Sequence, residues 1–452
     1  MGVIQWIINL GASVFLPILL FIFGLILRIK PGKAFKAGLT VGIGFIGLNL
    51  VINLLSSQLG PATKLMIHNY GLHLQSIDVG WPAASAIAYG TALGVMAIPI
   101  GVIVNVVLLL FGLTRTLDVD LWNYWHVAFA GSIIYLLTNN MWLGIFSMVV
   151  VTMFTYFFAD LSAPKVQEYY GLDGISFPHG LSAPGYVFAL PFKWLFDHIP
   201  GFNKVHVNAE TVQKHLGVFG DMTVMGAIIG LVIGLLAHMS VAKVLQLAVN
   251  MAAVMMLMPR MVSLLMEGLT PISEAANKMV QKHFPGKKLY IGMDSALAIG
   301  QQSVLSASLI LIPITLFLAV ILPGNKVLPF VDLATLPYFF ALFAAAFDGD
   351  ILKTVIAGAA DIVLSLYIST WFAPVITKLA KAASFNMKGN ASISVLSDGG
   401  VWTNFIYIMT GEKFQWIGMT VLFVIALLLL FWLKMRNARK DAMAAKAKHS
   451  RK

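Results

Sequence analysis

The residues of this chain that could do chemistry are a few acids and histidines set in apolar surroundings. Asp78 opens the stretch Asp78-Val79-Gly80-Trp81-Pro82. Its carboxylate can accept hydrogen bonds from two adjacent hydroxyl groups, which suits a polyol ligand. Trp81 offers a flat apolar face to the C–H side of such a ligand. The simpler alternatives are that Asp78 caps the following helix and that Trp81 only packs.

A second acid opens a similar stretch in the other half of the chain. Asp294 is followed by Ser295 and, further on, by Gln301 and Gln302. These two glutamines point about 100° apart on a helix, so one of them is expected to bond the protein instead of a ligand. Contacts between helices are the alternative for both. The candidate substrate-binding residues are Asp78, Trp81, Asp294, Gln301 and Gln302.

Two histidines are the candidate catalytic residues. His126 ends the stretch Trp122-Asn123-Tyr124-Trp125-His126, and His179 stands between Pro178 and Gly180 on a predicted turn. Imidazole titrates near neutral pH and serves as a general acid or base, although a purely structural role is the alternative for each. The chain has no HExxH or other metal spacing and no GxxxxGK[ST] loop. We therefore expect no metal, no cofactor and no nucleotide-driven pump.

The elements that position these side chains are predicted to lie in a membrane. Of the 452 residues, 59% are hydrophobic and 11% are charged, against about 25% charged in a typical soluble domain. The run from Trp416 to Leu433 holds 18 residues without a charge, which suits one helix across about 30 Å of hydrocarbon. The composition predicts an all-α, polytopic membrane protein.

Apolar runs divide the chain into two groups of predicted membrane-spanning helices. Two further stretches, 78–92 and 294–303, are short and rich in small residues, so they predict re-entrant or broken helices inside the protein. A mixed segment, 161–219, holds more Pro, Gly, His and charge and separates the two groups. The eleven predicted spans are 9–28, 35–57, 93–113, 125–138, 140–160, 220–238, 241–260, 304–323, 333–347, 352–373 and 414–434.

Basic residues gather behind the first and the last span. Arg28, Lys30, Lys33 and Lys36 follow the first, and eight Lys and Arg residues lie within 434–452. Lys and Arg favour the cytoplasmic side, so the N-terminus is predicted outside and the C-terminus in the cytoplasm. These clusters account for the formal net charge of +11 without a nucleic-acid partner. Residues 1–10 lack the basic region of a signal peptide, and the chain contains no cysteine for disulfide or thiolate chemistry.

The two halves resemble each other at an offset near 210–216 residues. If 161–219 stays cytoplasmic, the second half is inverted relative to the first, which is a transporter architecture. We therefore divide the chain into a first membrane repeat (1–160), a connecting segment (161–219), a second membrane repeat (220–434) and a basic cytoplasmic tail (435–452). The matches are Gly24-Leu25 with Gly234-Leu235, Lys33 with Lys243, Asp78 with Asp294, Ile98-Pro99-Ile100 with Ile312-Pro313-Ile314, and Val119-Asp120-Leu121 with Val331-Asp332-Leu333.

Taken together, the motifs resemble those of the galactitol-type membrane subunit (enzyme IIC) of the bacterial phosphoenolpyruvate-dependent sugar phosphotransferase system. The resemblance covers nearly the whole chain in order. Its matching stretches are DVGWP at 78–82, VDLWNYWH at 119–126, PHG at 178–180, VLQLAVNMAAVMMLMPR at 244–260, GLTPI at 268–272, VLSASLILIPI at 304–314 and PGNKVLPFVDLAT at 323–335.

The resemblance implies the ascorbate–galactitol superfamily fold, with inverted repeats, a substrate-holding core, a dimerising scaffold and elevator-like motion. It also implies a homodimer in the bacterial cytoplasmic membrane. A polyol, with galactitol as the leading choice, would enter from outside and receive phosphate from the phosphocysteine of a separate IIB subunit, which works with a IIA subunit. Asp78, His126, His179 and Asp294 stand in matching stretches, but the resemblance does not assign the residue that activates the hydroxyl.

Two other classes of function remain open. A cation-coupled polyol symporter would use Asp78 or Asp294 as its ion site. A membrane-embedded enzyme is disfavoured because the sequence holds no metal-binding or nucleophile constellation. Neighbouring reading frames for IIA and IIB would favour the phosphotransferase function, and their absence would favour the symporter.

Overall fold

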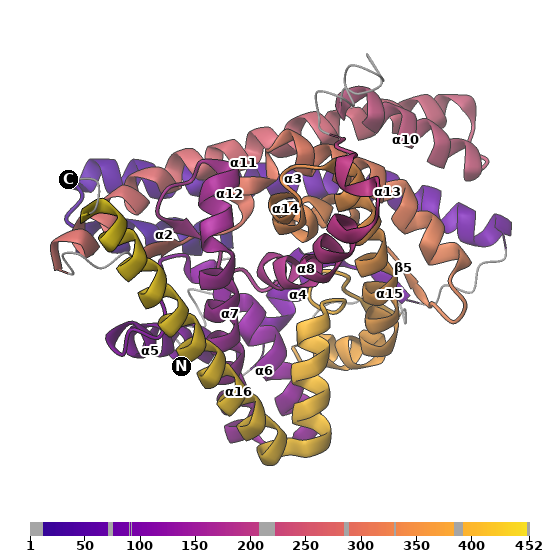
Figure 1. Ribbon diagram of the computed structural model, residues 1–452. Coiled ribbons are helices and arrows are strands. Elements are labelled where there is room, and N and C mark those ends of the chain that lie inside the picture. The colour runs from indigo at the N-terminus through magenta and orange to yellow at the C-terminus, as the bar shows by residue number, and fades with distance from the viewer. Residues whose placement is uncertain are drawn as a thin grey trace.

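The computed structural model describes residues 12–70, 76–89, 91, 93–207, 222–283, 289–329, 331–383 and 392–449. Each of the eleven predicted spans overlaps an α-helix (Figure 1). The α-helices are α2 (Ala12–Ile26), α3 (Pro31–Tyr70), α4 (Gly80–Tyr89), α5 (Ala97–Leu110), α6 (Tyr124–Thr138), α7 (Met141–Tyr170), α8 (Ser182–His198), α10 (Met222–Leu236), α11 (Val241–His283), α12 (Ala296–Ile299), α13 (Gln302–Ile321), α14 (Leu336–Ala346), α15 (Ile351–Ala382) and α16 (Trp402–His449).

Several of these helices suit a membrane. Within the described residues, four helices are long and apolar enough to cross one, namely α7, α13, α15 and α16. The outer face of α16 carries large apolar side chains, with Ile417 78% and Leu428 62% exposed. A contiguous apolar surface of this kind is expected against lipid and not against water. The structure is thus a mostly helical membrane protein, as predicted.

Six short strands accompany the helices in the part of the chain that the structure describes. The all-α prediction missed them because a strand of two or three residues is too short to show an alternating pattern. The strands are β1 (Ser76–Asp78), β2 (Thr116–Asp118), β3 (Ile175–Ser176), β4 (Tyr290–Gly292), β5 (Val327–Leu328) and β6 (Ser392–Ser394).

The strands form two small parallel sheets with the orders β5-β1-β6 and β2-β4-β3. In the first sheet, Ile77 of β1 lies opposite Leu328 and Ile393. In the second sheet, Ile291 of β4 lies opposite residues of β2 and β3. Each sheet therefore takes its central strand from one half of the chain and both outer strands from the other half.

The longest helix pair, α3 and α11, runs side by side through the molecule (Figure 1). The two backbones come close because Gly268 of α11 faces α3. A Cβ atom at Gly268 would lie 2.7 Å from the carbonyl oxygen of Ala37 and 2.6 Å from the side chain of Val41. Helix α2 packs along α3, and α10 packs along α11 in the same way.

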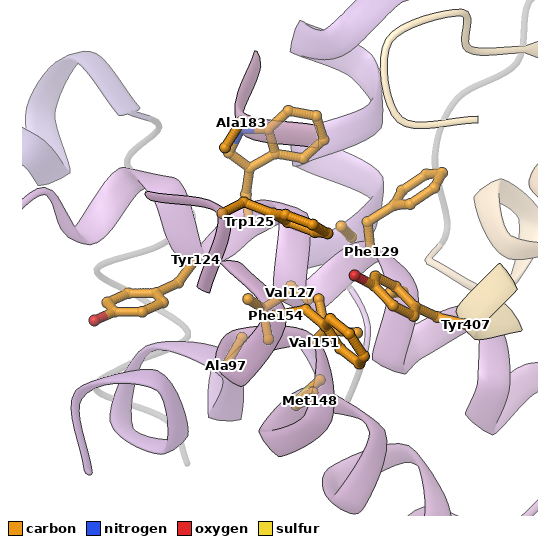
Figure 2. Close-up of a cluster of buried hydrophobic side chains, with 14 of the residues drawn as sticks. Ala97, Tyr124, Trp125, Val127, Phe129, Met148, Val151, Phe154, Ala183 and Tyr407 are labelled. Atoms are coloured by element: carbon orange, nitrogen blue, oxygen red, sulfur yellow. The ribbon is translucent and has the colours of Figure 1, made fainter. Parts of the chain in front are cut away.

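Aromatic side chains of α6, α7 and α16 form the part of the core that positions the site (Figure 2). Phe129 and Trp125 of α6 are buried, with 0% and 2% of their surfaces exposed. The ring centroids of Phe154 and Tyr407 lie 5.4 Å apart. The Trp125 ring in turn lies 4.1 Å from the ring of His126. This packing holds α6, and with it His126, in one orientation.

Helix α16 reverses direction within its length. At Gln415 the backbone leaves the helical region, with φ 45° and ψ −126°, and two arms of the helix meet there at the lower edge of Figure 1. The predicted span from 414 to 434 falls on the second arm, while the first arm already begins at Trp402. Gly418 lets the arms approach, because a Cβ atom there would lie 2.6 Å from the side chain of Thr410.

The first part of the predicted connecting segment packs into the body of the protein. Helix α7 extends to Tyr170, and β3 and α8 follow it. Phe177, Ala183 and Ala189 are fully buried, and α8 packs against α14. This part of 161–219 therefore contributes to the core around His179, and residues 208–219 lie outside the described residues.

Candidate functional site

An acid or a histidine stands at or just beyond the carboxyl end of every one of the six strands. Because neighbouring strands in both sheets are parallel, these ends gather at one edge of each sheet, where ligands bind in parallel sheets generally. The residues are Asp78 at the end of β1, Asp118 at the end of β2, His179 after β3, Asp294 after β4, Asp332 after β5 and Asp398 after β6.

A chain of hydrogen bonds connects side chains from both sheets through α6. Both carboxylate oxygens of Asp398 lie near Nδ1 of His126, at 2.9 and 3.0 Å. Nε2 of His126 lies 3.3 Å from Nε2 of His179. All three side chains are buried, with 0% of Asp398, 2% of His126 and 5% of His179 exposed. The structure thus brings the two predicted histidines into contact with each other.

The partners of the two imidazoles fix which nitrogens carry protons. The backbone N–H of Ser182 donates to Nδ1 of His179 at 3.3 Å, so the proton of neutral His179 is assigned to Nε2. Nδ1 of His126 faces a carboxylate and therefore carries a proton, which leaves Nε2 of neutral His126 as an acceptor. Hydrogen bonds then run in one direction, from His179 to His126 to Asp398.

Asp294 and Asp120 form the open end of this chain. Oδ1 of Asp294 lies 3.6 Å from Nε2 of His179, and 15% of the Asp294 side chain is exposed. Burial and the neighbouring Asp294 charge raise the pKa of Asp120 to about 7. Burial lowers the pKa of His179 well below its usual range, and the nearby His126 lowers it further. Burial thus favours the neutral forms of His179 and Asp120.

Asp78 and Asp332 form a second acid pair, which is closed. Neither residue is exposed. The Asp78 carboxylate accepts from the backbone N–H groups of Gly80 and Leu396, both at 3.1 Å, and from that of Asp332 at 2.8 Å. These bonds tie β1 to the segments that follow β5 and β6. The bond from Gly80, at the start of α4, is the one that the capping alternative for Asp78 describes.

Asp332 occupies a comparable position in the same closed pair. Its carboxylate accepts from the backbone N–H of Trp81 at 3.0 Å and from that of Ser397 at 2.6 Å. Ser397 is followed directly by Asp398, so this bond also helps to hold the turn that carries Asp398. A buried carboxylate satisfied by several backbone donors stabilises local structure and is costly to disturb.

The two sheets differ at the position level with Asp78. Ser394 lies opposite Asp78 in the first sheet, and Ser176 lies opposite Gly292 in the second. The second sheet thus has a glycine where the first has the carboxylate that accepts from the N–H of Leu396. The acid of the second sheet, Asp294, lies two residues further along the chain, and 15% of its side chain is exposed.

The other predicted site residues lie around these pairs. The half-buried Trp81 ring packs edge to face against Trp122, with centroids 6.2 Å apart. The side-chain oxygen of Gln301 accepts from the N–H and the hydroxyl of Ser303 at 2.9 and 2.7 Å, which caps α13. Gln302 is exposed. Of the two glutamines, Gln301 thus bonds the protein at a helix start.

Sequence reasoning did not select Asp398, Asp120 or Asp332 as site residues. A signal existed for two of them, because Asp120 and Asp332 matched each other in the comparison of the two halves. For Asp398 the signal was weaker. It precedes Gly399 on a turn, much as His179 precedes Gly180.

The chemistry available here is hydrogen bonding to hydroxyl groups and proton transfer. Across the described ranges, no group of three or more His, Asp and Glu side chains is placed to hold a metal ion. The acid pair can bind hydroxyls, and a buried imidazole backed by a carboxylate can take up a proton. These functions suit a polyhydroxylated ligand.

The fold and this edge of polar side chains belong to a class of membrane permeases. Residues 6–391 match the EIIC-GAT family, described as "PTS system sugar-specific permease component". The chain belongs to this family. It is therefore an integral inner-membrane component of a sugar phosphotransferase system and works with separate proteins of that system.

Individual relatives agree with the family. The chain is 41% identical over 398 residues to the "PTS system galactitol-specific EIIC component" of Escherichia coli (strain K12), and the match covers 88% of each chain. The protein of the same name in Escherichia coli O157:H7 matches to the same extent. A "Putative permease IIC component" of Escherichia coli (strain K12) is 40% identical over 399 residues, 88% of this chain and 91% of that one. The resemblance drawn from the motifs is confirmed.

Proposed function

We propose that this chain carries galactitol across the bacterial inner membrane and that a separate IIB subunit phosphorylates the polyol during its passage. The family and the 41% identity to a galactitol-specific component support this substrate. The chain itself contains no cysteine, so a phosphocysteine donor has to come from a partner. IIA would recharge IIB in the same complex.

The observation that carries the proposal is the contact of His179 with the partly exposed Asp294. Galactitol hydroxyls would donate to the carboxylates of Asp120 and of Asp294, whose side chain is 15% exposed. The Nε2–H of His179, 3.6 Å from Asp294, would donate to a hydroxyl oxygen. Trp81 and Trp122 would face the C–H groups of the carbon chain. Gln302 is too exposed for a buried ligand, and Asp78 serves the scaffold.

The proposed architecture is a pair of inverted repeats. Helix α2 ends at Ile26 and α10 at Leu236, which is within the range of offsets found between the two halves of the sequence. The residues near their ends, Arg28 and His238, share a positive φ of 61° and 51°. The two sheets also correspond strand by strand. If β1 is matched with β4, β5 with β2 and β6 with β3, the order β5-β1-β6 becomes β2-β4-β3. Such correspondences in order and geometry support a duplicated unit, and inversion would place both acid pairs near the membrane centre.

The orientation and the assembly are part of the same proposal. The N-terminus would lie outside and the C-terminal tail in the cytoplasm, because the basic clusters after the first and last spans favour that side. Residues 1–160 and 220–434 would be the two repeats, joined by 161–219 and followed by the tail 435–452. Two copies would associate as a homodimer, with α3 and α11 as the scaffold that each copy contributes.

Uptake by reconstituted vesicles tests this function. Vesicles would hold phosphoenolpyruvate, the general phosphotransferase proteins, IIA and IIB inside, with labelled galactitol outside. We expect labelled galactitol phosphate in the lumen, and we expect none when IIB lacks its cysteine. Mannitol, a stereoisomer, serves as the matched control substrate. Free galactitol accumulated by an ion gradient without IIB would contradict the proposal and favour a cation-coupled polyol symporter.

A further inference from the structure

We propose that Asp398 is a positioning residue that makes His126 the proton acceptor for the attacking hydroxyl of the substrate. The inference rests on the proposed function, because it assumes that a hydroxyl is phosphorylated at this site. It assigns different roles to the two histidines and brings in a residue 272 positions away from His126 in the sequence.

The carboxylate of Asp398 is held firmly in place. Asp398 is fully buried in the turn between β6 and α16. The side-chain N–H of Asn404 donates to the backbone oxygen of Asp398 at 3.0 Å and to its Oδ1 at 3.2 Å. The preceding residue, Ser397, donates its N–H to Asp332 at 2.6 Å. The carboxylate therefore meets Nδ1 of His126 with little freedom to turn away.

This contact selects one tautomer of His126. With Nδ1–H directed at a carboxylate, Nε2 keeps its lone pair, which accepts from His179 at rest and becomes available to a hydroxyl when His179 turns its N–H to the hydroxyl oxygen. The same carboxylate stabilises the imidazolium that forms when Nε2 takes up a proton, as a buried acid does behind a catalytic histidine. Other groups facing His126 are His179, the ring of Trp125 and, at longer range, the charge of Asp294. No positive side chain faces it among the contacts that the structure describes.

His179 cannot take the same role while its turn is intact. Its Nδ1 accepts from Ser182, so its Nε2 carries a proton and donates. His179 is therefore the hydrogen-bond donor that orients the hydroxyl oxygen, and His126 is the base. The division follows from the two turns that hold the imidazoles, one through Ser182 and the other through Asp398.

With these roles, each bond that breaks in the phosphate transfer is matched by a bond that forms. The O–H bond of the hydroxyl breaks and its proton goes to Nε2 of His126. The oxygen forms a bond to the phosphorus of the IIB phosphocysteine, and the S–P bond breaks to leave a thiolate. Before the transfer, the N–H of His179 turns from Nε2 of His126, 3.3 Å away, to the oxygen of the hydroxyl, because the single lone pair of Nε2 has to be free to take the proton.

The experiment compares Asp398→Asn with Asp361→Asn in the full-length protein. Asp361 is a buried carboxylate on α15, and no described contact joins it to the site, so it is a matched control. Three quantities are measured, namely the single-turnover rate of phosphate transfer from phospho-IIB, the galactitol affinity, and the nitrogen NMR signals of the His126 ring. We expect Asp398→Asn to transfer phosphate about 100-fold more slowly with unchanged affinity. Asp361→Asn should behave like the unmodified protein.

The NMR signals separate this inference from the proposed function. The unmodified protein should show His126 protonated on Nδ1, whether or not galactitol is its substrate, and Asp398→Asn should lose that preference. If Asp398→Asn does not fold, Asn404→Ala provides a milder disturbance and should slow transfer by about tenfold. A His126 ring protonated on Nε2 in the unmodified protein, or an undiminished transfer rate in Asp398→Asn, would overturn the inference. A protein that transfers no phosphate to galactitol at all would instead refute the proposed function.

Discussion

Replacing His126 with glutamine is expected to slow IIB-dependent phosphorylation of galactitol by about two orders of magnitude or more. Glutamine has a carboxamide oxygen that can accept a hydrogen bond, but it does not take up a proton near neutral pH. The hydroxyl would then have to lose its proton to water. Galactitol affinity should stay close to that of the unmodified protein, because the resting His126 is bonded to His179 and meets the hydroxyl only when His179 turns aside. Rapid-quench kinetics with phospho-IIB and equilibrium binding measure the two quantities.

His179→Gln is the matched control for this prediction. Its carboxamide keeps an N–H donor near the position of Nε2, so the transfer rate should fall by only about tenfold, the loss of one well-placed hydrogen bond. If His126→Gln weakened galactitol binding as much as it slowed transfer, His126 would be a binding residue and the proton-transfer role would be wrong.

Replacing Asp by Asn is expected to lower stability in the closed pair and galactitol affinity in the open pair. Asp78→Asn places an NH₂ group where backbone N–H donors of Gly80, Leu396 and Asp332 converge. At least one buried donor then loses its acceptor, at a cost of about 1–3 kcal/mol per group. The melting temperature and the folded yield should drop, while the affinity of the folded fraction should stay the same.

Asp294→Asn is expected to weaken galactitol binding and to leave the stability of the protein nearly unchanged. Its side chain is 15% exposed, and it bonds one backbone group, Ala296, at 2.8 Å in the described contacts. An amide oxygen can keep that bond, so stability should change little. Galactitol affinity should fall by about tenfold, which corresponds to replacing a charge-assisted hydrogen bond by a neutral one. Calorimetric binding and thermal unfolding in detergent measure both effects. A loss of affinity in Asp78→Asn with full stability would contradict this assignment.

Helix positions could be predicted from the sequence because each span is a long apolar run. The ends of the helices could not be predicted in this way. The run that begins near 35 loses its apolar character at about 57, yet α3 continues to Tyr70. Ala62 in this extension is fully buried, so tertiary packing keeps a less apolar segment helical.

The site could be predicted only in part. Residue type was enough to select His126 and His179, because few titratable side chains lie in apolar surroundings, and Pro178 and Gly180 flank His179. Their common partner Asp398 could not be found, since it is brought to His126 by a strand of three residues with no pattern of its own. The roles of Asp78 and Asp294 also could not be separated. Both open a short helix, and only the fold shows that Asp78 accepts from Leu396 at the end of β1, while Asp294 lies two residues beyond the end of β4.

The most direct measurement is a structure of the protein with galactitol bound. We expect galactitol hydroxyls within about 3.2 Å of the Asp294 carboxylate and of Nε2 of His179. One hydroxyl should also reach Nε2 of His126 once His179 turns aside. Asp78 should remain bonded to its backbone donors and make no contact with the ligand. Galactitol bound against Asp78, or at a place remote from His126 and His179, would contradict the account.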